Sequence, residues 1–457
     1  MLLRYLLVVS LLCTAGFAQS NASDGAIDGF VQDESGAFLS GAKVTVRNIH
    51  TNVETEALTN GSGYYRMPLL RIGEYEVKAQ AAGFADFTQS GIQLSVGKQA
   101  RVNVTLKVGQ VSDSVTVTAD AGIVEVGAAP TIEEVVNEKA VRSLPITSRN
   151  VYNFHLLGPG VKGIPSTGFG TTQFTFGGHN RSAWSVDGLD NTQRRFNRQI
   201  RLVISTPESV QEMQVISGAY SAEFGRAAGG VINVISRSGT NDLHFGGMWL
   251  YRPRQTAARP PLAATKPNQK WWMIGGNAAG ALSKDRLWFF INDEYNPLKV
   301  PQPVTINPDV ARILQISLPI SATRRSARPS HLSAKLNFRL SDRNSGFIRY
   351  NRFTNDQPGG GGGLTTIGRS TTFEDRMNGG AAQFTTVISP TVLNEIRFGI
   401  NRRAETRLPV GQIQPGSAAV NISGTANFGV NPLAGSASVE TSTQIIDNLT
   451  WTRGNTQ

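Results

Sequence analysis

Alternation of apolar and polar residues is the main pattern along this chain. In Leu332–Leu340, leucine, alanine and phenylalanine alternate with serine, lysine, asparagine and arginine. Val392–Arg402 repeats the pattern, with Ile396, Phe398 and Ile400 on one face. Because successive strand residues point to opposite faces, this alternation predicts strands with one apolar and one polar side. The same criterion predicts further strands at Leu243–Tyr251, Trp271–Leu282, Leu287–Tyr295, Gly346–Phe353, Gly380–Ile388 and Thr443–Thr452.

The connections between these predicted strands alternate in length. Tight turns are expected at Ser283–Arg286, Ser341–Ser345 and Ser389–Thr391, and long links at Arg252–Lys270, Asn296–His331, Thr354–Gly379 and Arg403–Ser442. Short turns at one rim and long loops at the other are typical of an outer-membrane barrel. Aromatic residues near the strand ends suggest interfacial girdles: Trp249, Tyr251, Trp271, Trp272, Trp288, Tyr350 and Trp451. The alternative is a soluble sandwich with long loops.

The N-terminal region alternates in shorter runs. Residues 1–18 have one arginine, an apolar run and small residues at the end, which indicates a secretory signal peptide. Residues 23–107 carry frequent turn signals and predict a small antiparallel sandwich. Through residues such as Gly29, Gly63 and Tyr65, this segment resembles the carboxypeptidase regulatory-like domain. Its one histidine, His50, leaves it without the ligand set of a zinc peptidase, so a structural or docking module is expected.

Residues 122–240 predict a small α+β domain. A helix is expected over Thr131–Ser143 and a second over Asn150–Leu157, because apolar residues recur at helical spacing before a proline in the first of them. Strands are expected at Phe174–Gly177, Ala183–Asp187, Met213–Ile216 and Gly230–Ile235.

Individual residues of this domain resemble the plug domain of TonB-dependent outer-membrane transporters. They are Asp187, Gly188, Tyr220, Phe224, Gly225, Gly229, Gly230 and Asn233. Ser217–Ala219 departs from the Arg-Gly-Pro usual in the family, which suggests its Oar-like branch with an extra N-terminal domain. The resemblance implies import of a surface-bound ligand through a plugged barrel of roughly 22 strands. Because about eight strands enclose too little space for a plug, the barrel is expected to continue beyond Gln457.

Residues 108–121 are expected to be a linker. Within it, Ser114, Val115, Thr116, Val117, Thr118 and Ala119 resemble the TonB box, which the inner-membrane TonB protein grips. An extended β-branched segment suits this role because it can add itself to the edge of a partner's sheet. Two alternatives stay open: the last strand of the preceding sandwich, and a plain linker.

Charge and chemistry narrow the function. The net charge is +11 with only 17% charged residues, and the arginines cluster in expected loops without a nucleic-acid-binding motif. Plug loops line the ligand cavity in the resembling family, so Arg181, Arg194, Arg195, Arg198 and Arg201 are ligand candidates. The single cysteine, Cys13, lies in the leader, and no nucleophile elbow, phosphate loop or paired histidines occur. We therefore predict no enzyme activity, catalytic residue, metal or cofactor.

The predicted fold is mainly β. It comprises an N-terminal Ig-like or prealbumin-like β-sandwich, a small α+β plug domain, and in 241–457 the first strands of an antiparallel transmembrane β-barrel. The predicted function is a TonB-dependent outer-membrane receptor with its N-terminal domains on the periplasmic side. Its expected partners are a TonB-type inner-membrane protein, outer-membrane lipid and an undetermined ligand: an oligosaccharide, a peptide or a metal chelate. The alternatives are a surface adhesion or assembly protein without transport, and a secreted soluble binding protein.

Overall fold

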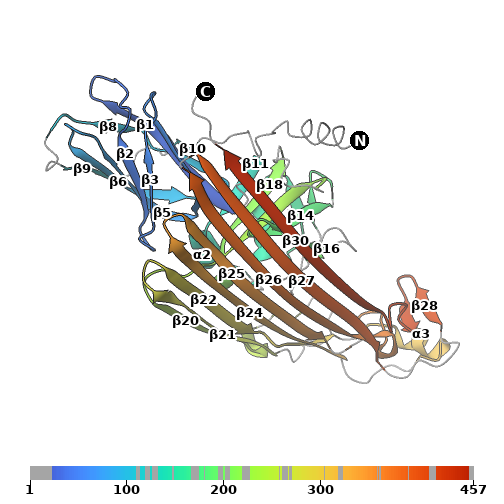
Figure 1. Cartoon of the computed structure of the whole chain (residues 1–457). Helices are drawn as coiled ribbons and strands as arrows, with labels where there is room; N and C mark the ends of the chain where they lie inside the picture. Colours follow the sequence, from blue (N-terminus) through green and yellow to red (C-terminus); the bar gives the residue numbers. More distant parts are fainter. Residues whose placement is uncertain are drawn as a thin grey trace, which may run out of the picture.

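The protein is built mainly from β-strands, in three parts that follow one another along the chain (Figure 1). The computed structural model describes residues 23–109, 114–118, 124–125, 132–146, 149–165, 174–179, 181–193, 199–200, 206–218, 227–256, 258–259, 266, 270–302, 304–316, 323–357, 359, 362–389, 391–410 and 418–451. The predicted signal peptide lies outside the described residues. No described helix is both long and apolar enough to cross a membrane, a finding that concerns helices only.

The first part is a two-sheet sandwich. Its strands are β1 (Asp24–Asp33), β2 (Lys43–Asn48), β3 (Glu54–Leu58), β4 (Tyr64–Arg71), β5 (Gly73–Gln80), β6 (Asp86–Leu94), β7 (Gln99–Arg101), β8 (Val104–Leu106), β9 (Ser114–Thr118) and β10 (Val124–Glu125). One sheet has the order β10-β7-β1-β4 with β8 also on β1, and the other has the order β3-β2-β5-β6-β9. The prediction of an antiparallel sandwich needs one correction. Strands β7 and β8 pair with β1 in parallel because the chain crosses between the sheets after β6.

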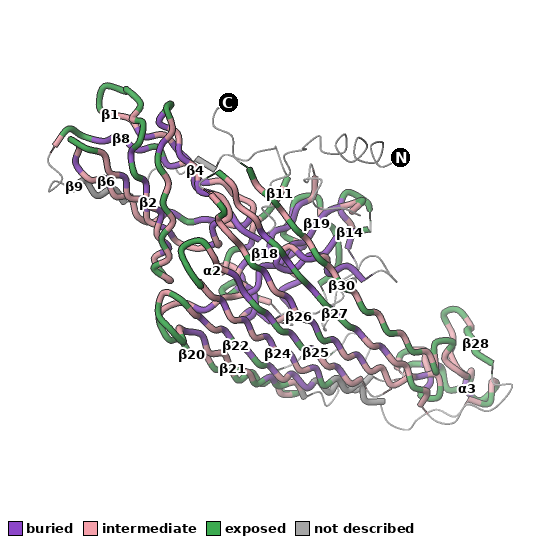
Figure 2. Tube along the Cα trace, viewed as in Figure 1, coloured by how far each residue is buried: buried purple, intermediate pink, exposed green. Residues whose placement is uncertain are grey.

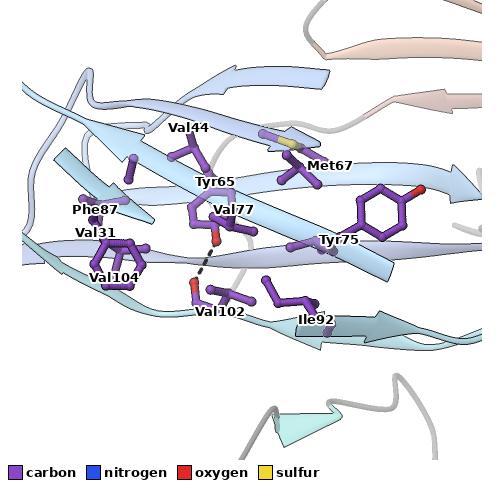
Figure 3. Close-up of a cluster of buried hydrophobic side chains, with 14 of the residues drawn as sticks. Val31, Val44, Tyr65, Met67, Tyr75, Val77, Phe87, Ile92, Val102 and Val104 are labelled. Carbon is purple, nitrogen blue, oxygen red and sulfur yellow. Dashed lines mark hydrogen bonds between the residues drawn. The ribbon is translucent and has the colours of Figure 1, made fainter. Parts of the chain in front are cut away.

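The sandwich encloses an apolar core between its sheets. Val31 on one sheet and Val44 and Val77 on the other have no exposed surface and belong to one buried cluster (Figure 3). Two tyrosines bring hydroxyls into this core: Tyr75 donates to the carbonyl oxygen of Arg71 at 2.7 Å, and Tyr65 donates to that of Val102 at 2.7 Å. These bonds satisfy groups whose burial would otherwise be costly. The alternation read from the sequence therefore points its apolar side inward in this part of the chain.

The second part, which we call the central domain, surrounds one small sheet. Its elements are β11 (Ile132–Val136), α2 (Glu138–Ser143), η1 (Val151–Leu157), β12 (Val161–Gly163), β13 (Phe174–Phe176), β14 (Ser182–Val186), β15 (Leu189–Asp190), β16 (Thr192–Gln193), β17 (Gln199–Ile200), η2 (Pro207–Ser209), β18 (Val210–Gly218) and β19 (Gly230–Ser236). The main sheet has the order β11-β18-β19-β14-β15, and β14 pairs with β19 in parallel while its other described pairs are antiparallel. The four strands predicted here and the short helix near residue 151 are present.

The helix predicted over Thr131–Ser143 is wrong in its first half. Ile132–Val136 forms strand β11, which pairs with β18, and the helix begins only at Glu138. Asn137 caps it, because its side chain accepts a hydrogen bond from the amide of Ala140 at 2.9 Å. Apolar residues at helical spacing also suit a strand when they are β-branched. Here Ile132–Val136 forms a strand rather than a helix because it pairs with the free edge of β18.

The third part is one large antiparallel sheet, which we call the long-stranded sheet. Its strands are β20 (His244–Arg252), β21 (Lys270–Ser283), β22 (Leu287–Tyr295), β23 (Leu298–Gln302), β24 (Thr323–Ser341), β25 (Asn344–Gln357), β26 (Thr371–Ser389), β27 (Val392–Pro409) and β30 (Ala437–Trp451). They follow chain order, with β23 bridging β21 and β24. Every strand predicted for this region is confirmed. Within the described residues the sheet is open, and β20 and β30 form its edges.

The two ends of this sheet carry connections of different length, as predicted from the sequence. At one end, tight turns join β21 to β22, β24 to β25 and β26 to β27, and the sandwich lies beside them (Figure 1). The opposite end carries the long connections, which contain α3 (Pro308–Ile313), β28 (Ala419–Ile422) and β29 (Ala426–Gly429), besides the short turns η3 (Arg254–Thr256) and η4 (Ile367–Arg369). Ile306, Ala311 and Ala426 form a small buried core there. Part of the long loops is thus ordered.

The two faces of the long-stranded sheet have opposite polarity. On β27, Ile396, Phe398 and Ile400 are 43%, 42% and 44% exposed, whereas Arg397 lies between two of them and is buried. Figure 2 shows the buried strands of the central domain lying against the inner face. The apolar side of β27 therefore points outward, as in strands that face lipid. One predicted girdle residue is misplaced, because Trp288 is fully buried and donates from Nε1 to Asn241 Oδ1 at 2.8 Å.

Candidate functional site

The best-defined polar site lies where the central domain meets the long-stranded sheet. It begins at the turn between β14 and β15, where Val186 pairs with Leu189 and leaves a two-residue loop, Asp187-Gly188. Both loop residues have positive φ, 48° and 74°. Asp-Gly favours this hairpin geometry because glycine and, among residues with a side chain, aspartate and asparagine tolerate the left-handed region best. The turn places the Asp187 carboxylate at the tip of a buried hairpin.

Two cations of the long-stranded sheet face this carboxylate. Arg349 Nη1 lies 2.8 Å from Asp187 Oδ2, and Lys335 Nζ lies 3.8 Å from Oδ1. Lys335 and Arg349 are register partners on the neighbouring strands β24 and β25. Like charges directly opposite each other destabilise a strand pair, and burial strengthens the repulsion. Asp187 therefore supplies the negative charge that lets both cations remain inside.

Hydrogen bonds fix the orientation of this carboxylate. The amide and the hydroxyl of Ser236, the last residue of β19, donate to Asp187 at 2.9 and 2.7 Å. The Lys335 ammonium donates to the Ser236 carbonyl at 3.1 Å, so the same residue contacts both sides. Burial raises the pKa of Asp187, but the charges of Lys335 and Arg349 and the Ser236 hydrogen bonds together hold that pKa below its ordinary value. The carboxylate is thus ionised at neutral pH.

Further polar contacts join the central domain to strands on both sides of this site. Arg149 Nη2 lies 2.5 Å from Glu208 and 3.6 Å from Glu294 of β22. At the other side, the Gln444 amide of β30 donates to the Asp190 carbonyl at 2.6 Å and its oxygen accepts from the Asp190 amide at 2.9 Å. The central domain is therefore attached to the inner face from β22 to β30.

An apolar cluster backs the polar site. Trp184 of β14 is 1% exposed, and the rings of Tyr152 and Phe174 pack edge-on against it at centroid distances of 5.2 and 5.7 Å. Phe353 and Met377 of the long-stranded sheet belong to the same buried cluster. The site thus has an apolar floor shared by both parts, and the polar contacts lie at its rim.

The structure explains several residues that carry the plug resemblance. Asn233 is fully buried and accepts a hydrogen bond from the Ser185 hydroxyl at 2.7 Å, across the parallel pair β14–β19. A side chain at Gly230 would meet Phe176 and the Ile216 carbonyl at 2.7 Å, so only glycine fits there. Gly229 precedes it in a similarly narrow space. These residues shape the central sheet, and Tyr220, Phe224 and Gly225 lie outside the described residues.

Of the five arginines predicted to bind ligand, the structure describes only Arg181. Arg181 is exposed, and its carbonyl accepts hydrogen bonds from the amides of Ala228 and Gly229 at 3.2 and 2.9 Å. Its backbone thus braces the start of β19, while its side chain stays available to solvent. The remaining candidates, Arg194, Arg195, Arg198 and Arg201, lie outside the described residues. Their role in ligand binding stays a prediction.

The segment that resembles the TonB box has a defined backbone position. Ser114–Thr118 forms β9, which pairs in parallel with β6 of the sandwich, Ser114 opposite Asp86 and Thr118 opposite Ser90. The chain then contributes β10 to the edge of the other sandwich sheet, beside β7, before it reaches the central domain. Ala119 lies outside the described residues. The position agrees with the alternative of a last sandwich strand, and it leaves a coupling role open.

Sequence reasoning missed the sheet side of the polar site. Lys335 and Arg349 lie at polar positions of alternating strands, where the sequence gives no reason to distinguish them from solvated lysines and arginines. The one available signal is that the polar positions of a strand with an apolar outer face point into the barrel interior, where a plug can cover them. A charged residue there needs a partner, because buried charges are paired.

Comparison with known proteins agrees with this architecture. Residues 26–107 match the carboxypeptidase regulatory-like domain, and residues 307–457 match an outer membrane β-barrel domain. Over 300 residues the chain is 26% identical to the TonB-dependent transporter Oar of Myxococcus xanthus, a match covering 61% of this chain and 27% of Oar. The chain therefore spans about a quarter of that relative's length.

One solved transporter structure shares the fold over most of this chain. The outer membrane transporter YddB from Escherichia coli matches with a TM-score of 0.53 at 11% identity, over 71% of this chain and 46% of YddB. The siderophore receptor PirA from Acinetobacter baumannii has a TM-score of 0.46 at 18% identity, over 70% of this chain and 44% of PirA.

These findings define the class of protein. The chain combines a carboxypeptidase regulatory-like domain with strands of an outer membrane β-barrel. It is a homologue of the TonB-dependent transporter Oar over about a quarter of that protein's length. The barrel-domain match indicates the outer membrane as the location of this part of the chain.

Proposed function

We propose that this protein is a TonB-dependent receptor that binds a ligand at the cell surface and imports it with energy from the inner membrane. The observation that carries the proposal is the attachment of the central domain to a sheet that is polar inside and apolar outside. In this proposal the central domain is the plug, and the Asp187 site holds it in place. No described group of His, Cys, Asp and Glu residues could hold a metal ion, and the proposed mechanism uses no bound cofactor.

The geometry supports a plug that can be released. Ion pairs and hydrogen bonds connect it to the long-stranded sheet at Asp187, Arg149 and Asp190. Such contacts exchange for water at modest net cost, whereas an apolar interface of the same area would not. A pull on the linker ahead of β11 would therefore detach the central domain strand by strand. The proposed partner is a TonB-type protein that pairs with residues 114–119.

Uptake measurements test this function. Cells making the full-length protein would receive labelled ferric chelates, oligosaccharides and oligopeptides in parallel, with and without a protonophore. We expect one probe class to accumulate only while the proton gradient is intact. Deletion of residues 114–119 should abolish accumulation but leave surface binding unchanged.

Three outcomes would contradict the proposal. Accumulation that survives both the protonophore and the deletion would exclude energy coupling through this segment. Surface binding of a probe or of other cells, with no energised accumulation of any probe, would favour the adhesion alternative. Partition of the mature protein into the aqueous fraction would favour a soluble binding protein.

A further inference from the structure

The edge position of β9 shows how the sandwich could take part in energy coupling, an inference that rests on the proposed function. Strand β9 is the last strand of the sheet β3-β2-β5-β6-β9. Among the described strands it pairs with β6 alone, and no described strand covers its other edge. Such an edge is a ready template for an added strand. Because β9 is already extended, pairing costs less ordering entropy in residues 114–118 than pairing with a free linker would.

The two edges of this sheet differ in a way that favours β9. At the opposite edge, β3 carries Glu54 and Glu56, and the carbonyl of Glu54 already accepts a hydrogen bond from Arg339 at 3.2 Å. Charged residues and occupied backbone groups protect an edge from further pairing. Strand β9 has the sequence SVTVT, without charge or proline. The sheet therefore offers an incoming strand one suitable edge of the two.

The sandwich is also attached to the sheet of the central domain. Lys98 Nζ lies 2.7 Å from Glu133 of β11, and the Gln214 amide of β18 donates to the same carboxylate at 2.7 Å. The amide of Val96 donates to the Glu212 carboxylate of β18 at 2.8 Å. One lysine and one backbone amide of the sandwich thus reach two neighbouring strands of the central sheet.

An apolar contact extends this attachment to the next strand. Ile72 and Val96 of the sandwich form a buried cluster with Ile235 of β19. Because β11, β18 and β19 are adjacent in the central sheet, the sandwich contacts one continuous side of it. These non-covalent contacts connect the sandwich to the central domain directly. The linker after β9 connects the same two parts through the chain itself.

We propose that the sandwich and β9 act together as one handle for the energy-coupling protein. An edge strand of the TonB-type protein would pair with the outer edge of β9 while β9 stays on β6. A pull on β9 would then reach the central sheet through the sandwich as well as through the linker. The sandwich contacts with Glu133, Glu212 and Ile235 transmit the force.

A reversible tether between β6 and β9 tests the first half of this proposal. Thr88 and Thr116 are register partners, and the single native cysteine, Cys13, lies in the predicted leader. The full-length Thr88→Cys/Thr116→Cys protein would be oxidised or reduced, and its affinity for the periplasmic domain of the TonB-type protein measured. We expect the same Kd in both states, with the two single-cysteine variants as controls.

The outcomes separate the two proposals. An affinity loss of about tenfold or more on oxidation, restored by reduction, would show that β9 must leave β6, and would overturn the handle while keeping the coupling segment. Binding that survives deletion of residues 114–119 would instead contradict the proposed function. Unchanged binding on oxidation, together with loss on deletion, supports the handle.

Loosening the sandwich from the central sheet tests the second half. The double variant Lys98→Met/Glu212→Gln should retain TonB-type binding but lose energised accumulation of the probe that the wild type imports. Lys107→Met is a matched control, because Lys107 pairs at 3.8 Å with Glu34 inside the sandwich, at an exposed position. Accumulation by the double variant at the wild-type rate would overturn force transmission through the sandwich.

Discussion

The sandwich and the long-stranded sheet use the same alternation of residues in opposite senses. In the sandwich, Val44 and Val77 point into a closed core, and the residues that alternate with them face outward. In the long-stranded sheet, Phe398 and Ile400 point outward, while Arg397 is 1% exposed. Period-two alternation fixes which residues share a face, but the surroundings decide which face is buried.

The difference shows which interactions hold each region together. The sandwich is held by an apolar core, in which shape decides the packing. The inner face of the long-stranded sheet meets the central domain through paired charges as well as through the apolar side chains of Phe353 and Met377, and removing one partner of a buried pair is costly. Substitutions that are mild in one region should therefore be severe in the other, and the predictions below test this in order of expected effect.

The largest effect is expected at Asp187. Asp187→Asn keeps the size of the side chain but leaves Lys335 and Arg349 facing each other without a counter-charge. We expect a loss of about 3–5 kcal/mol in the stability of the docked central domain, the usual cost of breaking a buried ion pair. Chemical unfolding followed by protease resistance would measure it. Asp242→Asn, at an exposed position just before β20, should be nearly neutral, and an equal loss there would contradict the assignment.

A charge placed on the outer face should separate the two regions. Ile400→Lys puts an ammonium on the apolar face of β27, at a cost of about 2–4 kcal/mol if that face meets the bilayer core. Leu58→Lys is the matched change in the sandwich, where Leu58 is 69% exposed, and should cost almost nothing. Assembly into outer-membrane fractions and unfolding in lipid vesicles would measure both. Equal tolerance would exclude a lipid-facing sheet.

A smaller loss is expected from one hydrogen bond in the sandwich. Tyr65→Phe removes the hydroxyl that donates to the Val102 carbonyl and leaves that buried acceptor without this partner. The expected cost is about 1–2 kcal/mol. Thermal unfolding should show a lower transition for the sandwich and an unchanged one for the central domain. A shift of the second transition instead would mean that the two parts unfold as one unit.

The smallest effect is expected from a change in pH, because protonation of Asp187 alters docking of the central domain only at acid pH. Its folded-state pKa lies below the ordinary value, so its ion pairs stabilise the docked state fully above that ordinary value. The contribution is lost as the pH falls through the folded-state pKa. Docking should thus be flat from neutral to mildly acid pH and weaken only below the ordinary aspartate pKa. Asp187→Asn should lack this acid step, and an identical acid profile would argue against the ion pairs.

Much of the fold was predictable because alternation is a local property. The strands of the long-stranded sheet were predicted by their apolar residues, but β24 and β26 extend well into segments expected to be loops. One such extension, Thr371–Asn378, carries charged residues on both faces, so periodicity gives little signal there. Pairing with neighbouring strands continues the ladder without a clear apolar side. Strands of about 9–11 residues suffice to span a membrane, and these run further.

The functional contacts were less predictable because they join distant parts of the chain. Asp187 was identified as part of a turn motif, yet nothing local indicates Lys335 or Arg349 as its partners. The place of β9 was similarly open, since five β-branched or small polar residues suit a linker, a sandwich strand or a partner's sheet. Strand register over long sequence separations decides both cases, and periodicity does not contain it.

The geometry of one turn has a consequence for which residues can occupy it. A left-handed backbone at position 187 restricts the choice to glycine, asparagine and aspartate with little strain. Two buried cations restrict it to an anion. Glutamate satisfies only the second requirement and asparagine only the first. A library of all twenty amino acids at this position, selected for a docked central domain, should return aspartate alone.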